Sequence, residues 1–285
     1  MKIKITADST CDLSPALIQQ YDVGIIPLFV ALGEKNLLDG VTITPDDIYD
    51  YYANTKKLPK SAARSSEEYF EFFQTFINEG YDAVIHFNIS ADMSASHNNA
   101  VIASKRFSNV YVVDSRSLST GTALLALDAY DMAQAGMSPD DIVARAQSRV
   151  DAVQASFIIN SLEFLHKGGR CSSLAYFGAN LMQIKPSIAV NNGKMGTMNK
   201  YVGKYPRCVD KYVESVHTTF TNPDKKRCFI THTKLSEEII NSVMEQVKSW
   251  GIFDEVLETI AGCTVTSHCG EGTIGVLFIN DGGKC

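Results

Sequence analysis

The chain lacks several features that would place it in a membrane or outside the cell. Its 285 residues include no apolar run long enough to cross a bilayer and no low-complexity tract. No signal-peptide pattern is present, because "MKIKITADST" leads directly into a strand pattern. Seven cysteines are scattered without a C-x-x-C pair, a spacing that favours reduced thiols over disulfides or a zinc site. We therefore expect a cytoplasmic protein with no transmembrane segment and no metal centre.

A positive net charge is also missing. The chain has 26 lysines and arginines against 32 aspartates and glutamates, a formal net charge of −6. Nucleic acids and anionic membranes bind proteins mainly through their phosphates, so we expect no nucleic-acid partner and at most a transient contact with a membrane surface. Basic clusters occur at 56–57, 167–170 and 225–227. The first and last are typical of solvated faces, because charge runs without aromatic residues usually are.

Strand and helix patterns alternate through the first half of the chain. The apolar runs "KIKITADS", "VGIIPLFVAL", "DAVIHF" and "NVYVVDS" predict strands. Segments between them, such as "TPDDIYDYYAN" and "SSEEYFEFFQTFINEG", open with capping residues and predict helices. This alternation predicts an α/β fold whose N-terminal part is a mostly parallel sheet with flanking helices.

The pattern changes at about residue 155. Asn192 and Gly193 stand between two extended runs, which is a strong hairpin signal, and helix and strand patterns then alternate to the end. The chain length favours two domains. We therefore predict an N-terminal parallel α/β domain over 1–155 and a C-terminal mixed α/β domain over 156–285, whose last strand could contribute to a shared cleft.

Gly270, Gly272 and Gly275 formally match the G-x-G-x-x-G pattern of dinucleotide-binding proteins. That site needs a helix after the glycines and an acidic residue about 20 positions further on. Here "TIGVLFI" over 273–279 predicts a strand, and only ten residues follow Gly275. The context excludes a nucleotide site. What remains is His268 in a strand-end turn, followed by glycines with exposed backbone N–H groups.

Two serine-rich loops stand at the ends of predicted elements. "PKSAARSSEE" contains Ser61, and "NISADMSASHNNA" contains Ser94 and Ser96. For any single serine, capping a helix is the more common role. Ligands of parallel sheets bind beyond the carboxyl ends of the strands, next to helix N-termini. Together with His268 and free backbone N–H groups, the hydroxyls therefore predict a small pocket for a carboxylate or a phosphate.

The order of these segments resembles a known family. Along essentially the whole chain, the sequence is similar to the DegV family of bacterial lipid-binding proteins in the order and spacing of "ITADST", "PKSAARSS", "NISADMSASHNNA", "VYVVDSRSLSTG", "LEFLHKGGR", "IKPSIAVNNGKM" and "HCGEGTIG". The resemblance implies a two-domain α/β protein that holds one long-chain fatty acid, without catalysis, in an apolar tunnel between the domains. Candidate walls of the tunnel are Phe87, Tyr176, Phe177, Leu181, Met182 and Ile188, although ordinary core packing is the more common role of each taken singly.

The resemblance also implies residue roles and a partner. The carboxylate of the fatty acid is expected to contact Ser61, Ser94 and His268, with further contacts from the backbone of Ala62, Gly270 and Gly272. A separate ATP-dependent fatty acid kinase would phosphorylate the bound carboxylate, and the binding protein would carry the acyl-phosphate towards phospholipid synthesis. The basic segment "HKGGR" resembles the one that docks this kinase, which points to Arg170.

The sequence departs from the family pattern next to the expected site. "SAAR" over 61–64 stands where the family usually has Thr-Ser-Gln-Pro, and Glu271 stands where it commonly has proline. An acid that pointed into an anion pocket would repel a carboxylate. Glu271 therefore either faces solvent or indicates a different ligand, such as that of a sensor or another small-anion binder.

A hydrolase or acyltransferase is a further alternative. It would use Ser94 or Ser61 as the nucleophile and His268 as the base. The chain has no G-x-S-x-G motif, and no acid is clearly placed to orient the histidine. A non-catalytic binding protein is therefore the favoured hypothesis, while the identity of the acid and the oligomeric state are left open.

Overall fold

The first half of the chain forms a four-stranded parallel sheet between two layers of helices. The computed structural model describes residues 1–171 and 184–283. All three strand pairings of this sheet are parallel, so the predicted parallel α/β arrangement is confirmed. In spatial order the strands are β2 (Gly24–Ile26), β1 (Ile3–Asp8), β6 (Ala83–Asn88) and β7 (Val110–Asp114).

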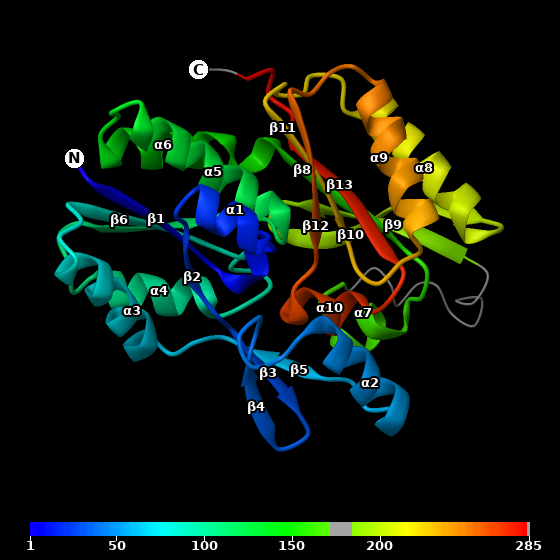
Figure 1. Ribbon diagram of the computed structural model, residues 1–285, viewed down its shortest axis with the longest axis horizontal. Helices are drawn as coiled ribbons and strands as arrows, with labels where there is room; N and C mark the ends of the chain where they lie inside the picture. Colours follow the sequence, from blue (N-terminus) through cyan, green and yellow to red (C-terminus); the bar gives the residue numbers. More distant parts are fainter. Residues whose placement is uncertain (172–183, 284–285) are drawn as a thin grey trace.

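Helices cover both faces of this sheet because its strands are apolar on both sides. Tyr69 and Phe73 pack with Val84 on one face, and Leu17, Leu125 and further residues pack with Ile85 on the other. Figure 1 shows the two helical layers. The first layer consists of α3 (Ser66–Asn78) and α4 (Ser96–Ser104), and the second of α1 (Pro15–Gln20), α5 (Thr120–Gln134) and α6 (Pro139–Arg149).

A six-stranded mixed sheet follows. Its strand pairings are antiparallel except for the parallel pair of β11 and β12. Its spatial order is β10 (Lys194–Val202), β9 (Ile184–Asn191), β8 (Val153–Ile159), β13 (Thr273–Ile279), β11 (Arg227–His232) and β12 (Glu255–Ile260). Helices α8 (Tyr205–Thr219) and α9 (Glu237–Ser249) pack on one face. The predicted hairpin joins β9 to β10, with positive φ angles of 49° at Asn192 and 81° at Gly193, as a tight turn of this kind requires.

One hydrophobic core connects the two sheets. Helix α5 is buried along most of its length and packs against β1 and β6 as well as β8, β11 and β13. Its apolar side chains share one cluster with Ile5 of β1, Phe87 of β6, Phe229 of β11 and Leu277 of β13. Strand β13 lies in the interior of the mixed sheet, between β8 and β11. Because α5 contacts strands of both sheets, it forms a layer that the two sheets share.

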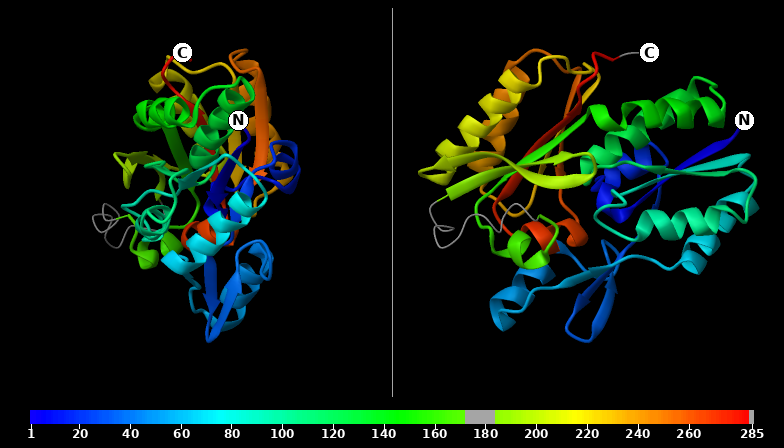
Figure 2. Two further views of the ribbon diagram at one scale, coloured as in Figure 1. Left: turned by 90° about the vertical axis from the view of Figure 1, so that its left-hand side faces the viewer. Right: turned by 180° about the vertical axis from the view of Figure 1, so that it is seen from behind.

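A third, smaller sheet was not predicted. The run "VGIIPLFVAL", expected as one strand, divides around Pro27 into β2 and β3, because proline has no N–H for a sheet ladder. The small sheet consists of β4 (Lys35–Leu38), β3 (Phe29–Leu32) and β5 (Lys60–Ala62), flanked by α2 (Pro45–Thr55). Two short helices, α7 (Glu163–Gly168) and α10 (Cys263–Cys269), lie between the small sheet and the mixed sheet (Figure 2). Two 3-10 turns, η1 (Ser9–Cys11) and η2 (Val150–Ala152), complete the elements.

Candidate functional site

A cavity of about 500 Å³ opens where the small sheet, the β6–α4 loop and α10 meet. Ser61 and Ala62 reach it from β5, Ser94 from the loop before α4, and His268 from α10. Arg170, just after α7, also lines it. Five predicted site residues, separated by up to 207 positions in the chain, thus surround one cavity.

Ser61 and His268 are in direct contact. The Oγ of Ser61 lies 2.8 Å from Nε2 of His268. The imidazole is largely enclosed, and this desolvation, together with the positive charge of Arg170, lowers the pKa of His268 to about 4. His268 lies in the last turn of α10 and not in the strand-end turn that the sequence indicated. At neutral pH the ring is therefore uncharged and carries a single N–H.

The surroundings of the ring indicate which nitrogen carries that proton. Nδ1 of His268 has no hydrogen-bond partner among the described residues, and it faces Gly168 so closely that a Cβ there would lie 2.7 Å away. Burying an N–H without an acceptor costs more free energy than burying an unprotonated ring nitrogen without a donor. We therefore assign the proton to Nε2, which donates to Ser61. The hydroxyl hydrogen of Ser61 is then free to donate into the cavity.

Ser94 is held by a chain of hydrogen bonds. Its Oγ lies 2.9 Å from the Oγ of Ser96 and accepts from the backbone N–H of Ser96. Ser96 in turn bonds to the hydroxyl of Tyr69, which accepts from Asn88 at 3.1 Å. Ser96, Tyr69 and Asn88 are buried, so the chain fixes the rotamer of Ser94 at the cavity wall from inside the core.

The backbone of Gly270 and Gly272 does not fit the expected role. Their N–H groups donate to the carbonyl oxygens of Thr266, at 2.8 Å, and Lys234, at 3.0 Å, and neither glycine lines the cavity. Both have positive φ angles, and a Cβ at Gly270 would lie 2.7 Å from the ring of Phe164. These glycines therefore serve the turn and its close packing, and their N–H groups are not free for a ligand.

Glu271 points away from the cavity. Its side chain is 57% exposed and lies 3.8 Å from Nζ of Lys234. It does not line the cavity, so it does not oppose an anion there. The reason for preferring a sensor or another small-anion binder is thereby removed.

Two buried aspartates position α10, and sequence reasoning did not single them out. The carboxylate of Asp39 accepts the N–H groups of Cys263 at 2.7 Å and Thr264 at 3.1 Å, and Asp12 accepts that of Gly262 at 2.8 Å. Burial raises the pKa of Asp12 well above its ordinary value. These bonds satisfy the free N–H groups at the start of the helix that carries His268. The aspartates lie more than 200 positions earlier in the chain, so no local pattern marks them.

The apolar part of the wall comes from the loops after β6 and β7 of the parallel sheet and from β10 of the mixed sheet. Ile89, Met93, Leu118 and Met195 line the cavity and pack in one cluster with the predicted wall residue Ile188. Phe87, also predicted as a wall, lies instead in the core between the sheets. The remaining predicted wall residues lie outside the described residues: Tyr176, Phe177, Leu181 and Met182.

Two structural findings concern membrane spans and metal sites. Within residues 1–171 and 184–283, no helix is both long and apolar enough to cross a bilayer. In the same part of the chain, no three or more His, Cys, Asp or Glu side chains are grouped so that they could hold a metal ion.

Comparisons with known proteins cover the whole chain. The sequence pattern of the DegV family matches residues 2–281. A fatty acid-binding protein of Thermotoga maritima is 27% identical over 281 residues, which are 96% of each chain. A DegV domain-containing protein of Clostridium perfringens is 28% identical over 284 residues, 98% of this chain and 99% of its own.

Solved structures have the same fold. A stearic acid-binding protein of Eubacterium ventriosum is 26% identical, with a TM-score of 0.83 over 98% of both chains. A DegV family protein of Thermus thermophilus, whose structure concerns fatty acid binding, has a TM-score of 0.90 over 98% of this chain and 100% of its own. At 24% identity, this second likeness establishes the fold alone.

Proposed function

Because the chain belongs to the DegV family, we propose that it is a binding protein that holds one long-chain fatty acid in the cavity of about 500 Å³. The observation that carries this proposal is the pair of Ser61 and His268, which turns a free hydroxyl towards a mainly apolar cavity. Relatives at 26% and 27% identity are described as binding stearic acid and fatty acids. The volume lies within the range of about 300–1,000 Å³ that is typical of ligand cavities.

The head group and the acyl chain would be recognised by different means. Ser61 and Ser94 would donate hydrogen bonds to the carboxylate, with His268 holding Ser61 and the backbone of Ala62 beside them. Each bond to a charged group contributes about 1.5–3 kcal/mol, and each buried methylene about 0.8 kcal/mol. The acyl chain would therefore supply most of the affinity, and the two hydroxyls would fix the direction in which the fatty acid lies.

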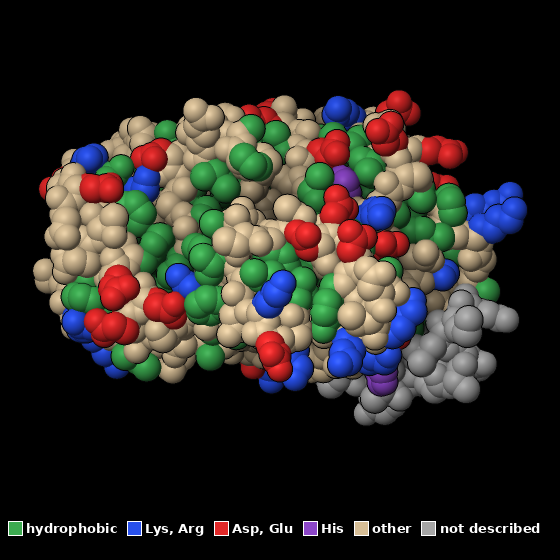
Figure 3. All heavy atoms as spheres, turned by 60° about the horizontal axis from the view of Figure 1, so that its bottom comes forward, with side chains coloured by type: hydrophobic (Ala, Val, Ile, Leu, Met, Phe, Trp, Pro, Cys, Tyr) green, Lys and Arg blue, Asp and Glu red, His purple; other side chains and the backbone are tan. Residues whose placement is uncertain are grey.

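We further propose that the carboxylate is presented to a separate ATP-dependent fatty acid kinase in the cytoplasm, and that the acyl-phosphate goes on to phospholipid synthesis. Arg170 lines the cavity, and lysines 56, 57, 60 and 167 line a neighbouring hollow of about 470 Å³. Figure 3 shows basic side chains gathered around a histidine at the lower right of this face. This basic surface suits an acidic partner, because charge complementarity guides docking.

The proposed site would lie at a junction of two domains. Ser61, Ser94 and Leu118 come from the proposed domain 1–155, and Arg170, Met195 and His268 from the proposed domain 156–285. Ligand cavities occur preferentially at such junctions.

Native mass spectrometry tests the binding proposal. We expect the purified protein to retain one equivalent of a long-chain fatty acid, because burying a long acyl chain, at about 0.8 kcal/mol per methylene, strongly favours the bound state. Organic extraction then identifies the acid. An empty protein that also refuses added fatty acid would contradict the proposal and leave the fold assignment unchanged.

An Arg170→Gln variant tests the docking proposal. We expect it to keep its fatty acid within a few-fold of the original affinity but to lose most phosphorylation by the kinase of the same organism. Glutamine removes the charge without placing an acid beside the cavity. Lys225→Gln is the matched control, since Lys225 is exposed and belongs to the basic cluster that does not line the cavity. Equal phosphorylation of both variants would refute the assignment of Arg170.

The contact of Ser61 with His268 also favours a second candidate, a serine hydrolase or acyltransferase. Its distance of 2.8 Å fits a nucleophile and a base. Two features oppose it: no acid bonds to Nδ1 in the part of the chain described here, and a pKa of about 4 makes the imidazole a weak base at neutral pH. Ester hydrolysis that disappears in His268→Ala would support this candidate.

A further inference from the structure

Thr264 is a polar residue of the cavity wall whose hydroxyl has no partner in the described part of the chain. Its side chain lines the cavity, and the residue is 5% exposed. Its Oγ1 has no hydrogen-bond partner among the residues that the structure describes. The backbone N–H of Thr264 is held by Asp39, so the position of the residue is fixed while its hydroxyl is left over. A buried hydroxyl without a partner costs free energy, so its presence calls for an explanation.

The place of Thr264 relative to His268 is set by the helix. Both lie on α10, four residues apart, so they face the same side and their Cα atoms are about 6 Å apart along the axis. The hydroxyl of Thr10, from the neighbouring turn η1, also lines the cavity but already donates to Asp8. Thr264 therefore lies about one helical turn from His268, which belongs to the proposed carboxylate contact.

The hydroxyl of Thr264 can reach the cavity without any movement of the backbone. One staggered step of χ1 moves Oγ1 to the place that Cγ2 held and Cγ2 to the place of the Cβ hydrogen, and threonine in a helix populates two such rotamers. Within residues 1–171 and 184–283, no hydrogen bond holds Oγ1 in its present rotamer. A polar atom on a bound molecule would therefore decide which way this side chain turns.

We propose that the cavity prefers an acyl chain with an oxygen substituent close to its carboxylate, namely a 3-hydroxy fatty acid, and that Thr264 is the residue that recognises it. This inference rests on the proposed function. With the carboxylate at Ser61 and His268, the 3-hydroxyl lies within the first few carbons, where Thr264 faces the same side of the cavity. An unsubstituted chain leaves the threonine hydroxyl unpaired, whereas the 3-hydroxyl satisfies it.

Competition binding tests the inference. 3-Hydroxytetradecanoic acid and tetradecanoic acid each displace a fluorescent fatty acid from the purified full-length protein. We expect about a 3- to 10-fold preference for the hydroxy acid, the size of one net hydrogen bond. Thr264→Val has nearly the same shape without the hydroxyl, and it should bring the ratio of the two affinities to about one.

Two further variants keep the outcome clear. Thr264→Ser retains a hydroxyl and should retain the preference. Thr266→Val makes the same substitution on the same helix, but the hydroxyl of Thr266 is bonded to Ala261 and does not line the cavity, so the preference should also survive. Equal binding of both acids by the original protein, or a preference that persists in Thr264→Val, overturns the inference and leaves the proposed function standing. Failure to bind either acid overturns both.

Discussion

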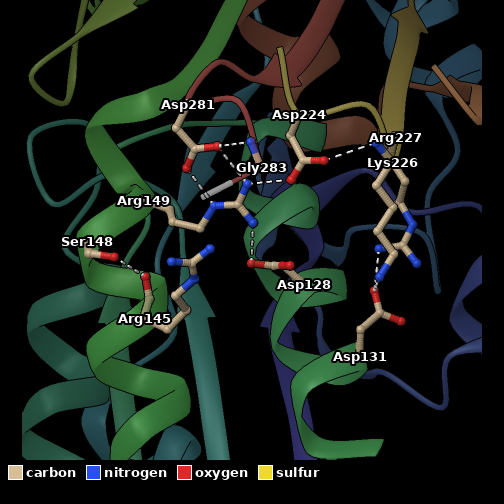
Figure 4. Close-up of polar contacts among 10 residues, drawn as sticks. All are labelled: Asp128, Asp131, Arg145, Ser148, Arg149, Asp224, Lys226, Arg227, Asp281 and Gly283. Atoms are coloured by element: carbon tan, nitrogen blue, oxygen red, sulfur yellow. Dashed lines mark hydrogen bonds and ion pairs between the residues drawn. The ribbon is translucent and has the colours of Figure 1, made fainter. Parts of the chain in front are cut away.

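An Arg149→Ala variant is expected to lose about 3–5 kcal/mol of unfolding free energy, the usual cost of removing one partner from a buried ion pair. Arg149, at the end of α6, has a side chain that is 4% exposed. Its guanidinium bonds to Asp128 on α5 at 2.7 Å, to Asp281 after β13 at 2.8 and 2.9 Å, and to Asp224 before β11 (Figure 4). The substitution leaves three largely buried carboxylates without their shared cation.

Arg149 acts on the charge of Asp281. Burial alone would raise the pKa of Asp281, but the hydrogen bonds and charge of Arg149 hold it below its ordinary value. The network joins helices packed on the parallel sheet to the α8–β11 connection and to the segment after β13 of the mixed sheet. Its loss should therefore loosen the packing of the two sheets as well as lower the stability.

Urea denaturation followed by circular dichroism measures the effect. Arg145→Ala is the matched control, because Arg145 lies one turn earlier on α6 and forms no close ion pair with the residues that the structure describes, so it should cost less than about 1 kcal/mol. Arg149→Met restores most of the apolar packing but no charge, and it should remain destabilised. If Arg149→Ala unfolds at the same urea concentration as Arg145→Ala, the network contributes nothing to stability.

A Ser61→Ala variant is expected to bind a long-chain fatty acid about 10- to 150-fold more weakly, which corresponds to one lost bond of about 1.5–3 kcal/mol to a charged group. His268→Ala should have a similar effect, because Ser61 then loses the N–H that keeps its own hydrogen free for the ligand. Since the two residues are in contact, the double variant should lose less than the product of the single effects.

Displacement of a fluorescent fatty acid measures these affinities. Ser61→Thr keeps the hydroxyl and should bind nearly as the original protein does. The fatty alcohol of the same chain length lacks the carboxylate, so Ser61→Ala should change its affinity little. With a pKa of about 4 for His268, affinity should also show no titration step near pH 6.5. Unchanged fatty acid binding by both single variants would rule out Ser61 and His268 as the head-group site.

Local patterns predicted the parallel sheet, the hairpin at Asn192 and the loops that meet at the cavity. Ser61 and Ser94 could be predicted as site residues because a few consecutive residues are enough to recognise a hydroxyl-rich turn at the end of a strand or helix. The chain order then places such turns at one edge. The structure brings them together with His268, while their role towards a ligand stays a prediction that the variants above test.

Features that depend on distant partners could not be predicted. The helix that carries His268 has seven residues, and its first N–H groups are bonded to Asp39, which lies 224 positions before Cys263. The N–H of Gly272, expected to meet an anion, is bonded to the carbonyl of Lys234. A glycine-rich sequence shows that backbone groups can be exposed, but only the fold determines which carbonyl groups reach them first.

Helix α5 determines how the molecule can open. Its side chains pack against both sheets, so separating the sheets about a hinge would expose Leu124, Leu125 and Leu127, each of which contributes about 1.5–3 kcal/mol by its burial. Loops that carry few buried apolar side chains move at a much smaller cost. We therefore expect the ligand to enter and leave through movements of the loops around the cavity. The relative orientation of the two sheets should then stay the same when the ligand binds and when it is released.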